Sequence, residues 1–374
     1  MMKFARKNFS ARQSISKGSY HKMNDIRIGL IGCGGISGKH LPELNNSKGA
    51  VIWALCDIDE GRLKSAGERY NVPEERRFRD YHDLINCPEV DAVDICTPNY
   101  LHVPMAEAAV DAGKPFCCEK PLGVSYDETV RLLEKARAKN IKSMVCFSYR
   151  FLPAVRYAKH LVDEGAIGNV ITFYAQYFKS SAFIKDRGLD WRFIGRDARY
   201  GVSGDLGVHI LDLASFLSGD VTSLAADLGI AVHERRKLDG SGMAPVETDD
   251  FCHFLAKFDK GASATFSITR AAYGNTNQIR VEVYGDKGAF RFDLNHPEKL
   301  EYYTGGIKEG HAIEHMETVE VPEEFRTVQM QCYVDLLHGN PDRYIPTLED
   351  GVKLQKVLDA ILESDEKRQW IDIK

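Results

Sequence analysis

The chain has 374 residues, of which 44% are hydrophobic and 28% charged, and its formal net charge is −5. This length exceeds what one hydrophobic core usually serves, so we expect a globular protein of two domains. The negative charge argues against nucleic acid or a membrane surface as a partner, because proteins that bind polyanions normally carry a basic face or domain.

Residues 1–24 differ in composition from the rest, because they contain six basic residues and no acidic one. No apolar run here is long enough for a secretory signal or a membrane span. An acid-free start with Arg and Ser fits an organellar transit peptide, but a start codon upstream of Met23 is the simpler interpretation. We therefore expect a disordered extension on a cytoplasmic protein, which is organellar only if residues 1–24 are a genuine transit peptide.

The nine cysteines lie mostly within apolar stretches, where a thiol behaves as a small hydrophobic group. No C-x-x-C pair and no zinc-type Cys/His spacing occurs in the sequence. The pattern indicates a reducing compartment and no structural metal.

The first predicted element is a buried parallel strand at residues 26–31, an apolar run rich in β-branched residues. A glycine loop follows, in which Gly32 and Gly34 match the pattern G-x-G-x-x-G. Ser37 stands where the third small residue belongs, so the match taken alone is weak.

The segment after the glycine loop strengthens this interpretation. A short helix is expected there, which Pro42 confines to a first turn or a restart. A second apolar strand at residues 50–56 then ends in Asp57, an acid at the strand tip. A strand, glycine turn, helix and acidic strand tip predict a dinucleotide site, with Asp57 accepting hydrogen bonds from the adenosine ribose. The acid favours NAD over NADP, although Arg62 nearby keeps NADP possible.

Strands and helices continue to alternate up to residue 150. Apolar strands are expected in EVDAVDICTPN, PFCCEKP and KSMVCFSYRF, and helices in HVPMAEAAVDAGK, closed by Gly113, and YDETVRLLEKARAKN, closed by Asn140. This rhythm predicts an α/β domain at residues 25–150 with a doubly wound parallel sheet of the Rossmann type. Because ligands bind beyond the carboxyl ends of such strands, TPN and EKP are candidate functional segments.

The pattern changes in residues 151–374. Apolar or alternating runs predict strands in VITFYAQYF, DDFCHFLAKF, ASATFSITR, QIRVEVYG and AFRFD. The same short turn, Asp-Lys-Gly, links two pairs of these strands at residues 259–261 and 286–288, so those pairs must be antiparallel. We expect an α+β domain with a large, mainly antiparallel open sheet, helices on one face, and a homodimer or homotetramer covering the other face.

Lys120 is the first candidate catalytic residue. It follows a predicted central strand at its carboxyl end, just before Pro121, where it would face the crevice that holds a nicotinamide. A cationic neighbour or partial burial would lower its pKa toward a catalytic range. The alternative is a surface lysine on a loop, which its position in the sheet disfavours.

A second candidate cluster lies in SGDLGVHILDLASFL. Asp205, His209 and Asp212 fall at positions i, i+4 and i+7, so a helix would present them on one face among apolar residues. A lone histidine on such a helix is more often a core residue than a catalyst, but an acid one turn earlier could hold His209 as a general base. The same residues could bind a divalent metal, which we consider the weaker alternative because no further ligand is evident.

Two short aromatic segments are candidates for substrate binding. They contribute Tyr149 and Arg150 in one case, and Trp191 and Arg192 in the other. Aromatic rings combined with planar donors suit a polyhydroxylated ring, and they are equally common in ordinary packing between domains.

Together the motifs resemble the Gfo/Idh/MocA family, the group of glucose-fructose oxidoreductase and inositol dehydrogenase. The resemblance runs from Ile26 to the C-terminus through GLIGCGGISGKH, LCDID, CTPNYLH, AGKPFCCEKPLG, YRFLPAVRYAKHLVDEGAIG, WRF and GDLGVHILDL. No single motif is specific, but seven in this order are.

The resemblance implies a role for each matching position. The dinucleotide loop falls on Gly32, Cys33, Gly34, Gly35 and Ile36, the ribose acid on Asp57, and the residues beside the nicotinamide on Thr97, Pro98, Asn99, His102 and Glu119. The catalytic residues implied are Lys120, Asp205 and His209.

The implied reaction is oxidation of a secondary alcohol on a cyclitol or sugar, with inositol the first expectation ahead of a glucoside or aminosugar. His209 would take the hydroxyl proton, Lys120 would stabilise the oxygen, and Asp205 would orient His209, without any metal. Two alternatives share the architecture: an NAD-using glycosidase, and a non-catalytic sensor of a dinucleotide or sugar. The presence of all three catalytic residues counts against the sensor.

Overall fold

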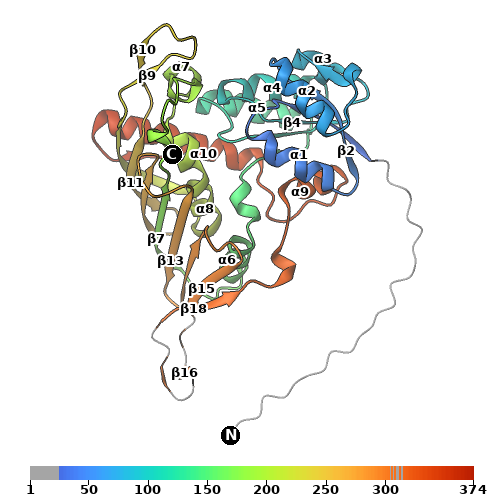
Figure 1. Ribbon diagram of the computed structural model, residues 1–374. Helices are drawn as coiled ribbons and strands as arrows, with labels where there is room; N and C mark the ends of the chain where they lie inside the picture. The colour runs from blue at the N-terminus through green and yellow to red at the C-terminus, as the bar shows by residue number, and fades with distance from the viewer. Residues whose placement is uncertain (1–24, 304, 306, 309–310, 313–314) are drawn as a thin grey trace, which may run out of the picture.

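The computed structural model describes residues 25–303, 305, 307–308, 311–312 and 315–374, so the expected disorder of residues 1–24 lies outside the described residues. Figure 1 shows two lobes side by side, one built around a small sheet and the other around a long one. No helix of the described ranges is long and apolar enough to cross a membrane.

The first lobe contains a six-stranded parallel sheet in the order β3-β2-β1-β4-β5-β6. Its strands are β1 (Ile26–Ile31), β2 (Ala50–Cys56), β3 (Arg77–Phe78), β4 (Ala92–Ile95), β5 (Phe116–Cys118) and β6 (Ser143–Val145). The strand order reverses next to β1, so the carboxyl ends of β1 and β4 flank the crevice typical of doubly wound sheets. The predicted Rossmann sheet is confirmed.

Five helices connect these strands: α1 (Ser37–Asn46), α2 (Glu60–Arg69), α3 (Tyr81–Asn86), α4 (His102–Asp111) and α5 (Tyr126–Ala138). Gly113 and Asn140 follow α4 and α5 with φ angles of 71° and 52°, the left-handed conformation that ends a helix. The expectation for α1 is wrong, because the helix runs through Pro42 to Asn46. Leu41 and Leu44 are buried on this helix, and their packing outweighs the one backbone hydrogen bond that proline removes.

The second lobe contains a nine-stranded sheet in the order β18-β15-β14-β13-β7-β12-β11-β8-β19. Its strands are β7 (Val170–Phe178), β8 (Val221–Gly229), β11 (Phe251–Phe258), β12 (Ser263–Thr269), β13 (Gln278–Gly285), β14 (Ala289–Asp293), β15 (Lys299–Tyr303), β18 (Glu317–Glu320) and β19 (Ile371–Asp372). All neighbouring pairs are antiparallel except β7 and β12, so the predicted mainly antiparallel open sheet is confirmed.

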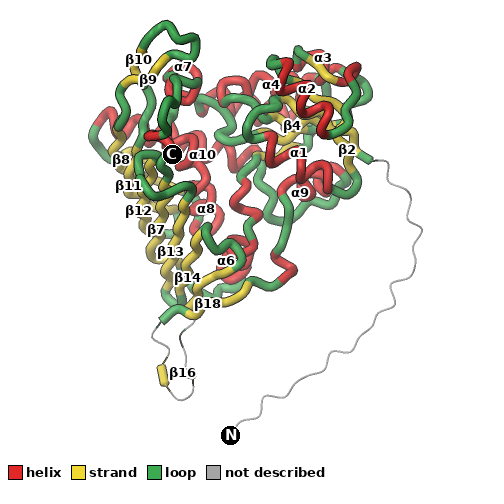
Figure 2. Tube along the Cα trace, viewed as in Figure 1, coloured by secondary structure: helices red, strands yellow, loops and turns green. Residues whose placement is uncertain are grey.

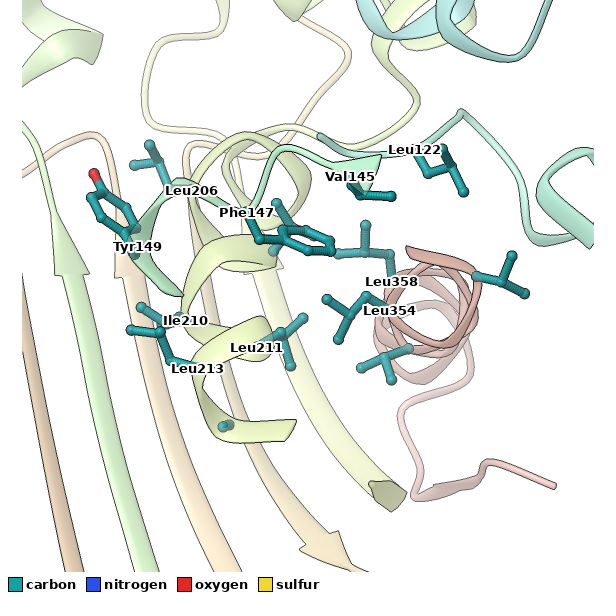
Figure 3. Packing of buried hydrophobic residues seen from close by; sticks show 14 of the residues in the cluster. Leu122, Val145, Phe147, Tyr149, Leu206, Ile210, Leu211, Leu213, Leu354 and Leu358 are labelled. Atoms are coloured by element: carbon teal, nitrogen blue, oxygen red, sulfur yellow. The ribbon is translucent and has the colours of Figure 1, made fainter. Parts of the chain in front are cut away.

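Helices cover one face of this sheet, as Figure 2 shows for α8 (Val208–Ser218) and α10 (Leu348–Lys367). On this face α8 packs against β7 and α10 packs against β8, and Figure 3 shows Leu211 of α8 and Leu354 of α10 facing each other. Helix α6 (Pro153–Asp163) contacts both α8 and β15. These contacts surround α8, so a side chain that projects from its N-terminal end is supported by a well-packed helix.

No helix of the described residues covers the opposite face of the sheet. Alternation along β7 and β11 points Phe173 and Phe254 into the core, and Tyr174 and Leu255 outward, where they are 46% and 48% exposed. A second copy of the chain on this face stays a prediction.

The end of the chain returns to the first lobe. Tyr333 of helix α9 (Gln329–Leu337) is fully buried and donates a hydrogen bond to the carbonyl of Val93 in β4, at 3.0 Å. Helix α10 contacts α5 and β6. Residues 329–337, which the sequence assigns to the second domain, therefore pack against the first. Helices α9 and α10 both contribute to the interface between the two lobes.

Candidate active site

Lys120 lies two residues after β5, at the carboxyl end of the parallel sheet. Its side chain is 12% exposed, and Nζ donates a hydrogen bond to the backbone carbonyl of Asp205 at 3.1 Å. The Asp205 carboxylate lies 3.7 Å from the same Nζ. The structure thus brings the EKP segment of the first lobe against the D-x-x-x-H segment of the second.

Asp205 does not lie on a regular α-helix with His209, because residues Ser203–Gly207 form a turn of π-helix that leads into α8. Its carboxylate faces two cations, Lys120 at 3.7 Å and Nε of Arg192 at 3.8 Å. Although burial alone would raise the pKa of Asp205, Lys120 and Arg192 hold it well below its usual value. Asp205 makes no hydrogen bond with His209 within the described ranges, so the expectation that it orients His209 directly is not supported by its contacts.

His209 projects from the first turn of α8 and is 8% exposed. Its ring packs against Tyr149 and Tyr177, with ring centroids 4.6 and 6.2 Å apart. Burial lowers the pKa of His209 well below 6.5, and the nearby charge of Lys120 lowers it further. The imidazole is therefore neutral at pH 7 and able to accept a proton. Its Nδ1 is buried without a hydrogen-bond partner among the described residues.

Three polar groups beside His209 form a closed hydrogen-bonded set. The hydroxyls of Tyr149 and Tyr177 lie 2.9 Å apart, and Tyr177 donates to Oδ1 of Asn277 at 2.7 Å. The amide of Asn277 in turn donates to the Tyr149 hydroxyl at 3.3 Å. The set fixes the orientation of hydroxyl and amide groups that suit a polyhydroxylated ligand.

All of these side chains line one cavity of about 520 Å³ between the two lobes, which we call the junction cavity. The residues that line it are Gly35, Ile36, Lys39, Thr97, Asn99, Glu119, Lys120, Ser148, Tyr149, Tyr177, Lys179, Ser181, Arg187, Trp191, Arg192, Asp205, Leu206, His209 and Asn277. The volume falls in the range of small-molecule sites.

The glycine loop at the floor of the junction cavity fits the pyrophosphate of a dinucleotide. A Cβ on Gly32, whose φ is 96°, would lie 2.6 Å from the carbonyl oxygen of Cys96, so the strand end admits only glycine there. A Cβ on Gly35 would meet nothing within 4 Å, so the loop surface is open on the side of the cavity. In the described chain, the N–H groups of Gly34, Gly35 and Ile36 donate to no protein acceptor, and free donors before a helix bind phosphate.

Asp57 lines an adjoining pocket of about 190 Å³ with Arg62, Arg79 and the loop glycines, as expected for an adenosine site. Its carboxylate accepts hydrogen bonds from the backbone N–H groups of Cys33 at 2.7 Å and Asp59 at 2.8 Å. Asp57 therefore also braces the glycine loop. Thr97 and Pro98 line the same pocket from the end of β4.

Three residues predicted for the cofactor and substrate sites lie outside both cavities, namely Cys33, Arg150 and His102. Arg150 is 5% exposed and directed away from the junction cavity, forming ion pairs with Asp212 at 2.6 Å and Asp350 at 3.1 Å. Adjacent residues of the short helix Ser148–Phe151 point in different directions, so Tyr149 reaches the cavity and Arg150 does not. The expectation that Arg150 binds substrate, and that Asp212 shares a functional stripe with His209, is corrected accordingly.

His102 is the third residue outside the cavities. Its ring nitrogens lie 2.7 Å from the carbonyl of Pro121 and 2.8 Å from that of Thr97. It therefore ties together the loops that carry TPN and EKP, and supports the cofactor site from behind instead of contacting it.

Glu119 belongs to a buried polar network beneath Lys120. Nδ1 of His40 lies 3.0 Å from both carboxylate oxygens of Asp94, and Nε2 lies 3.1 Å from Oε1 of Glu119. Although burial opposes it, Asp94 raises the pKa of His40 well above 6.5, so His40 is the cation between two acids. His40, Asp94 and Cys146 are also spaced closely enough to hold a metal ion, but hydrogen bonds already account for the His40 nitrogens.

Several of these residues were missed by reasoning from the sequence. Tyr177, Lys179 and Asn277 come from the ends of β7 and β13 and carry no local motif, so only the fold brings them to the site. Asp94 did carry a signal, because it is a lone acid within the apolar strand β4.

Comparison with known proteins identifies relatives of this chain. The levoglucosan dehydrogenase of Pseudarthrobacter phenanthrenivorans is 28% identical over 94% of this chain and 99% of its own length. The D-apiose dehydrogenase of Paraburkholderia graminis is 36% identical over 71% of this chain and 67% of its own length. A crystal structure of levoglucosan dehydrogenase in complex with NADH and levoglucosan aligns with a TM-score of 0.84, at 27% identity, over 94% of this chain and all of that one.

Family models match both lobes. Residues 26–147 match the oxidoreductase family with an NAD-binding Rossmann fold, and residues 155–291 match the GFO/IDH/MocA C-terminal domain. The cofactor is accordingly NAD, and the relatives are dehydrogenases that act on sugars and polyols. The chain belongs to the GFO/IDH/MocA family of NAD-binding sugar and polyol oxidoreductases.

Proposed function

We propose that the protein oxidises a secondary hydroxyl of a sugar or cyclitol ring with NAD, or runs the reverse reduction, in the junction cavity. The observation that carries the proposal is the convergence of Lys120, Asp205 and the neutral His209 in one cavity with the glycine loop. No one of these residues is diagnostic, but together they supply a base, a cation for a developing alkoxide, and a cofactor floor.

His209 acts as the general base. Its neutral imidazole accepts the proton of the substrate hydroxyl, and its rigid support on α8 keeps the ring in place. The Tyr149 ring against it limits its rotation. The lowered pKa keeps the base unprotonated in neutral solution, and the same property makes the protonated form ready to return the proton in the reverse direction.

Lys120 stabilises the negative charge that develops on the substrate oxygen. Its ammonium is anchored by the Asp205 carbonyl and carboxylate, so a substrate oxygen meets a donor that is already oriented. Asp205 acts through Lys120 and Arg192, because its carboxylate holds both cations beside the N-terminal end of α8. NAD held by the glycine loop and the Asp57 pocket would supply the hydride acceptor for the carbinol carbon.

The direct test measures absorbance of reduced nicotinamide when purified protein and NAD are mixed with a panel of inositols, hexoses, anhydrosugars, methyl glycosides and aminosugars. Oxidation of one ring class is the expected result. Aglycone release from an aryl glycoside without net NAD reduction would instead identify a glycosidase and contradict the proposal.

The pH dependence of oxidation follows from His209. Because burial and Lys120 place its pKa below 6.5, the base remains unprotonated in mildly acidic solution. We expect kcat/KM for oxidation to stay level as the pH falls through 6.5 and to decline only below it. An acidic limb with an apparent pKa above 6.5, in protein shown by circular dichroism to be folded, would contradict the role of His209.

Asp57 sets the preference for NAD. Replacing Asp57 by alanine removes a carboxylate that fits the ribose hydroxyls, while Arg62 and Arg79 remain beside the position of a 2′-phosphate. We expect affinity for NAD to fall roughly 10- to 100-fold, and affinity for NADP to fall less. Titration of nucleotide-induced fluorescence quenching measures both.

The control for this variant is Asp57→Asn, which retains an oxygen able to accept from the N–H of Cys33 and so keeps the loop braced. An equal loss for NAD and NADP in Asp57→Ala, with both affinities near the wild-type values in Asp57→Asn, would show that Asp57 only supports the loop.

A further inference from the structure

The junction cavity has an excess of positive charge. Its cationic side chains are Lys39, Lys120, Lys179, Arg187 and Arg192, and its acidic side chains are Glu119 and Asp205. Glu119 is committed to His40 at 3.1 Å, which leaves Asp205 as the acid available to the cations of the cavity wall. A cavity with this balance favours a ligand that brings negative charge of its own.

Most of the cations have partners in the protein. Lys120 and Arg192 share Asp205, and Arg187 pairs with Asp190 at 3.2 Å. Lys39 lies on α1 directly after the glycine loop, on the dinucleotide side. Its charge also reaches the substrate side of the cavity, because, together with burial, it lowers the pKa of both Lys179 and His209.

Lys179 is the cation of the second-lobe wall that lacks such a partner among the described residues. It is the residue after β7, is half-buried, and lines the junction cavity with Tyr177 and Asn277. Within the part of the chain that the structure describes, its ammonium forms no hydrogen bond or ion pair, and its clearest contact is the Tyr177 ring, with Nζ 5.8 Å from the centroid. Burial lowers the pKa of Lys179, and the charge of Asp205, which is too far away to form an ion pair, opposes this shift only in part.

Resting on the proposed function, we propose that the substrate is an acidic sugar, carrying a carboxylate or phosphate ester that Lys179 binds while the ring hydroxyl reaches His209 and Lys120. The position of Lys179 suits an anion-binding role separate from the cofactor, because Lys179 belongs to the cavity wall formed by the second lobe and the glycine loop belongs to the first. Arg187 lines the same cavity and adds positive charge to it, while its guanidinium pairs with Asp190 at 3.2 Å and donates to the carbonyl of Ser181 at 3.1 Å. An ammonium and a guanidinium together are a common recognition pair for phosphate and carboxylate.

The test compares substrates that differ only in charge. Steady-state kcat/KM with NAD is measured for matched pairs: glucose with glucose 6-phosphate and with gluconate, galactose with galacturonate, and inositol with inositol phosphate. We expect the charged member of one pair to be preferred by about 10- to 100-fold, the effect of one charged hydrogen bond. Comparing the phosphorylated with the carboxylated substrates shows which acidic group the site binds. The preference should weaken as salt is added, because the contact is electrostatic.

The matched variant is Lys179→Met, which keeps a long side chain and removes the charge. For the preferred acidic substrate we expect KM to rise about 10- to 100-fold with little change in kcat, and for its neutral partner no comparable rise. The control is Lys185→Met, an exposed lysine of the following loop that does not line the cavity.

The outcomes separate this inference from the proposed function. Oxidation of neutral rings alone, with Lys179→Met behaving like the wild-type protein, would overturn the acidic substrate and leave the dehydrogenase in place. Absence of NAD reduction with every pair, in protein that binds NAD, would overturn both.

Discussion

Replacing Lys120 by methionine is expected to lower the turnover number at least about a hundredfold, the scale of a lost charge-stabilising or acid-base group. Among the described residues, the Lys120 ammonium is the one cation held against both the backbone and the carboxylate of Asp205, whereas Arg192 faces the carboxylate only. NAD affinity should change little, because Lys120 lies beyond the glycine loop and the Asp57 pocket. Stopped-flow or steady-state absorbance of reduced nicotinamide measures the first quantity, and fluorescence quenching the second.

His209→Asn should lose turnover on the same scale, since asparagine keeps polarity but cannot accept a proton at neutral pH. The matched controls are Lys64→Met and His233→Asn, which change exposed residues of the same types. Turnover near the wild-type level in Lys120→Met or His209→Asn would remove that residue from the mechanism.

The second large effect is expected on stability. His40→Leu leaves the carboxylates of Asp94 and Glu119 buried without their cation, which costs about 3–5 kcal/mol of the free energy of unfolding. Urea unfolding followed by circular dichroism measures the loss. His82→Leu is the control, because His82 is an exposed histidine of the same lobe. If His40→Leu were as stable as His82→Leu, the network would not hold the strand ends together.

The dependence of this effect on pH can be worked out from the two shifted groups. Asp94 raises the pKa of His40 above its unfolded value of 6.5, so the stabilisation is present below pH 6.5 and is lost as the pH rises through the folded value. His40 lowers the pKa of Glu119 below its unfolded value of 4.5, so that contribution is present above pH 4.5 and is lost at lower pH. The difference in unfolding free energy between the wild type and His40→Leu should therefore be largest between pH 4.5 and 6.5.

Local patterns in the sequence predicted the elements that depend on local physics. Alternating apolar residues and the two Asp-Lys-Gly turns identified β11 to β14 and their antiparallel pairing. The glycine loop, the acid at the tip of β2 and the lysine after β5 could be placed at one sheet edge, because parallel strands align their carboxyl ends. The end of α1 was predicted wrongly because only the hydrogen bond lost at Pro42 can be read from the local sequence. The burial of Leu41 and Leu44, which stabilises the helix, depends on the tertiary structure.

The remainder of the site depends on distant contacts. A helical spacing suggested that Asp205 and His209 interact, but the π-helical turn rotates Asp205 toward Lys120, 85 residues away in sequence. Arg150 was predicted to bind substrate, but it pairs with Asp350, which is 200 residues away in the sequence and could not be foreseen from the local motif. Lys179 and Asn277 had no signal at all, because each meets the site only where its strand ends beside α8. Spacing rules hold along one element and do not extend between elements.

The measurement that tests the account most directly is the mass of the reduced cofactor formed from a substrate deuterated at every ring carbon. Direct transfer from carbon to nicotinamide predicts reduced NAD that is heavier by the mass of one deuterium in place of hydrogen, formed in equal amount to the oxidised sugar. Reduced NAD without deuterium, or glycoside cleavage with no net reduced NAD, would contradict hydride transfer from the ring in the junction cavity.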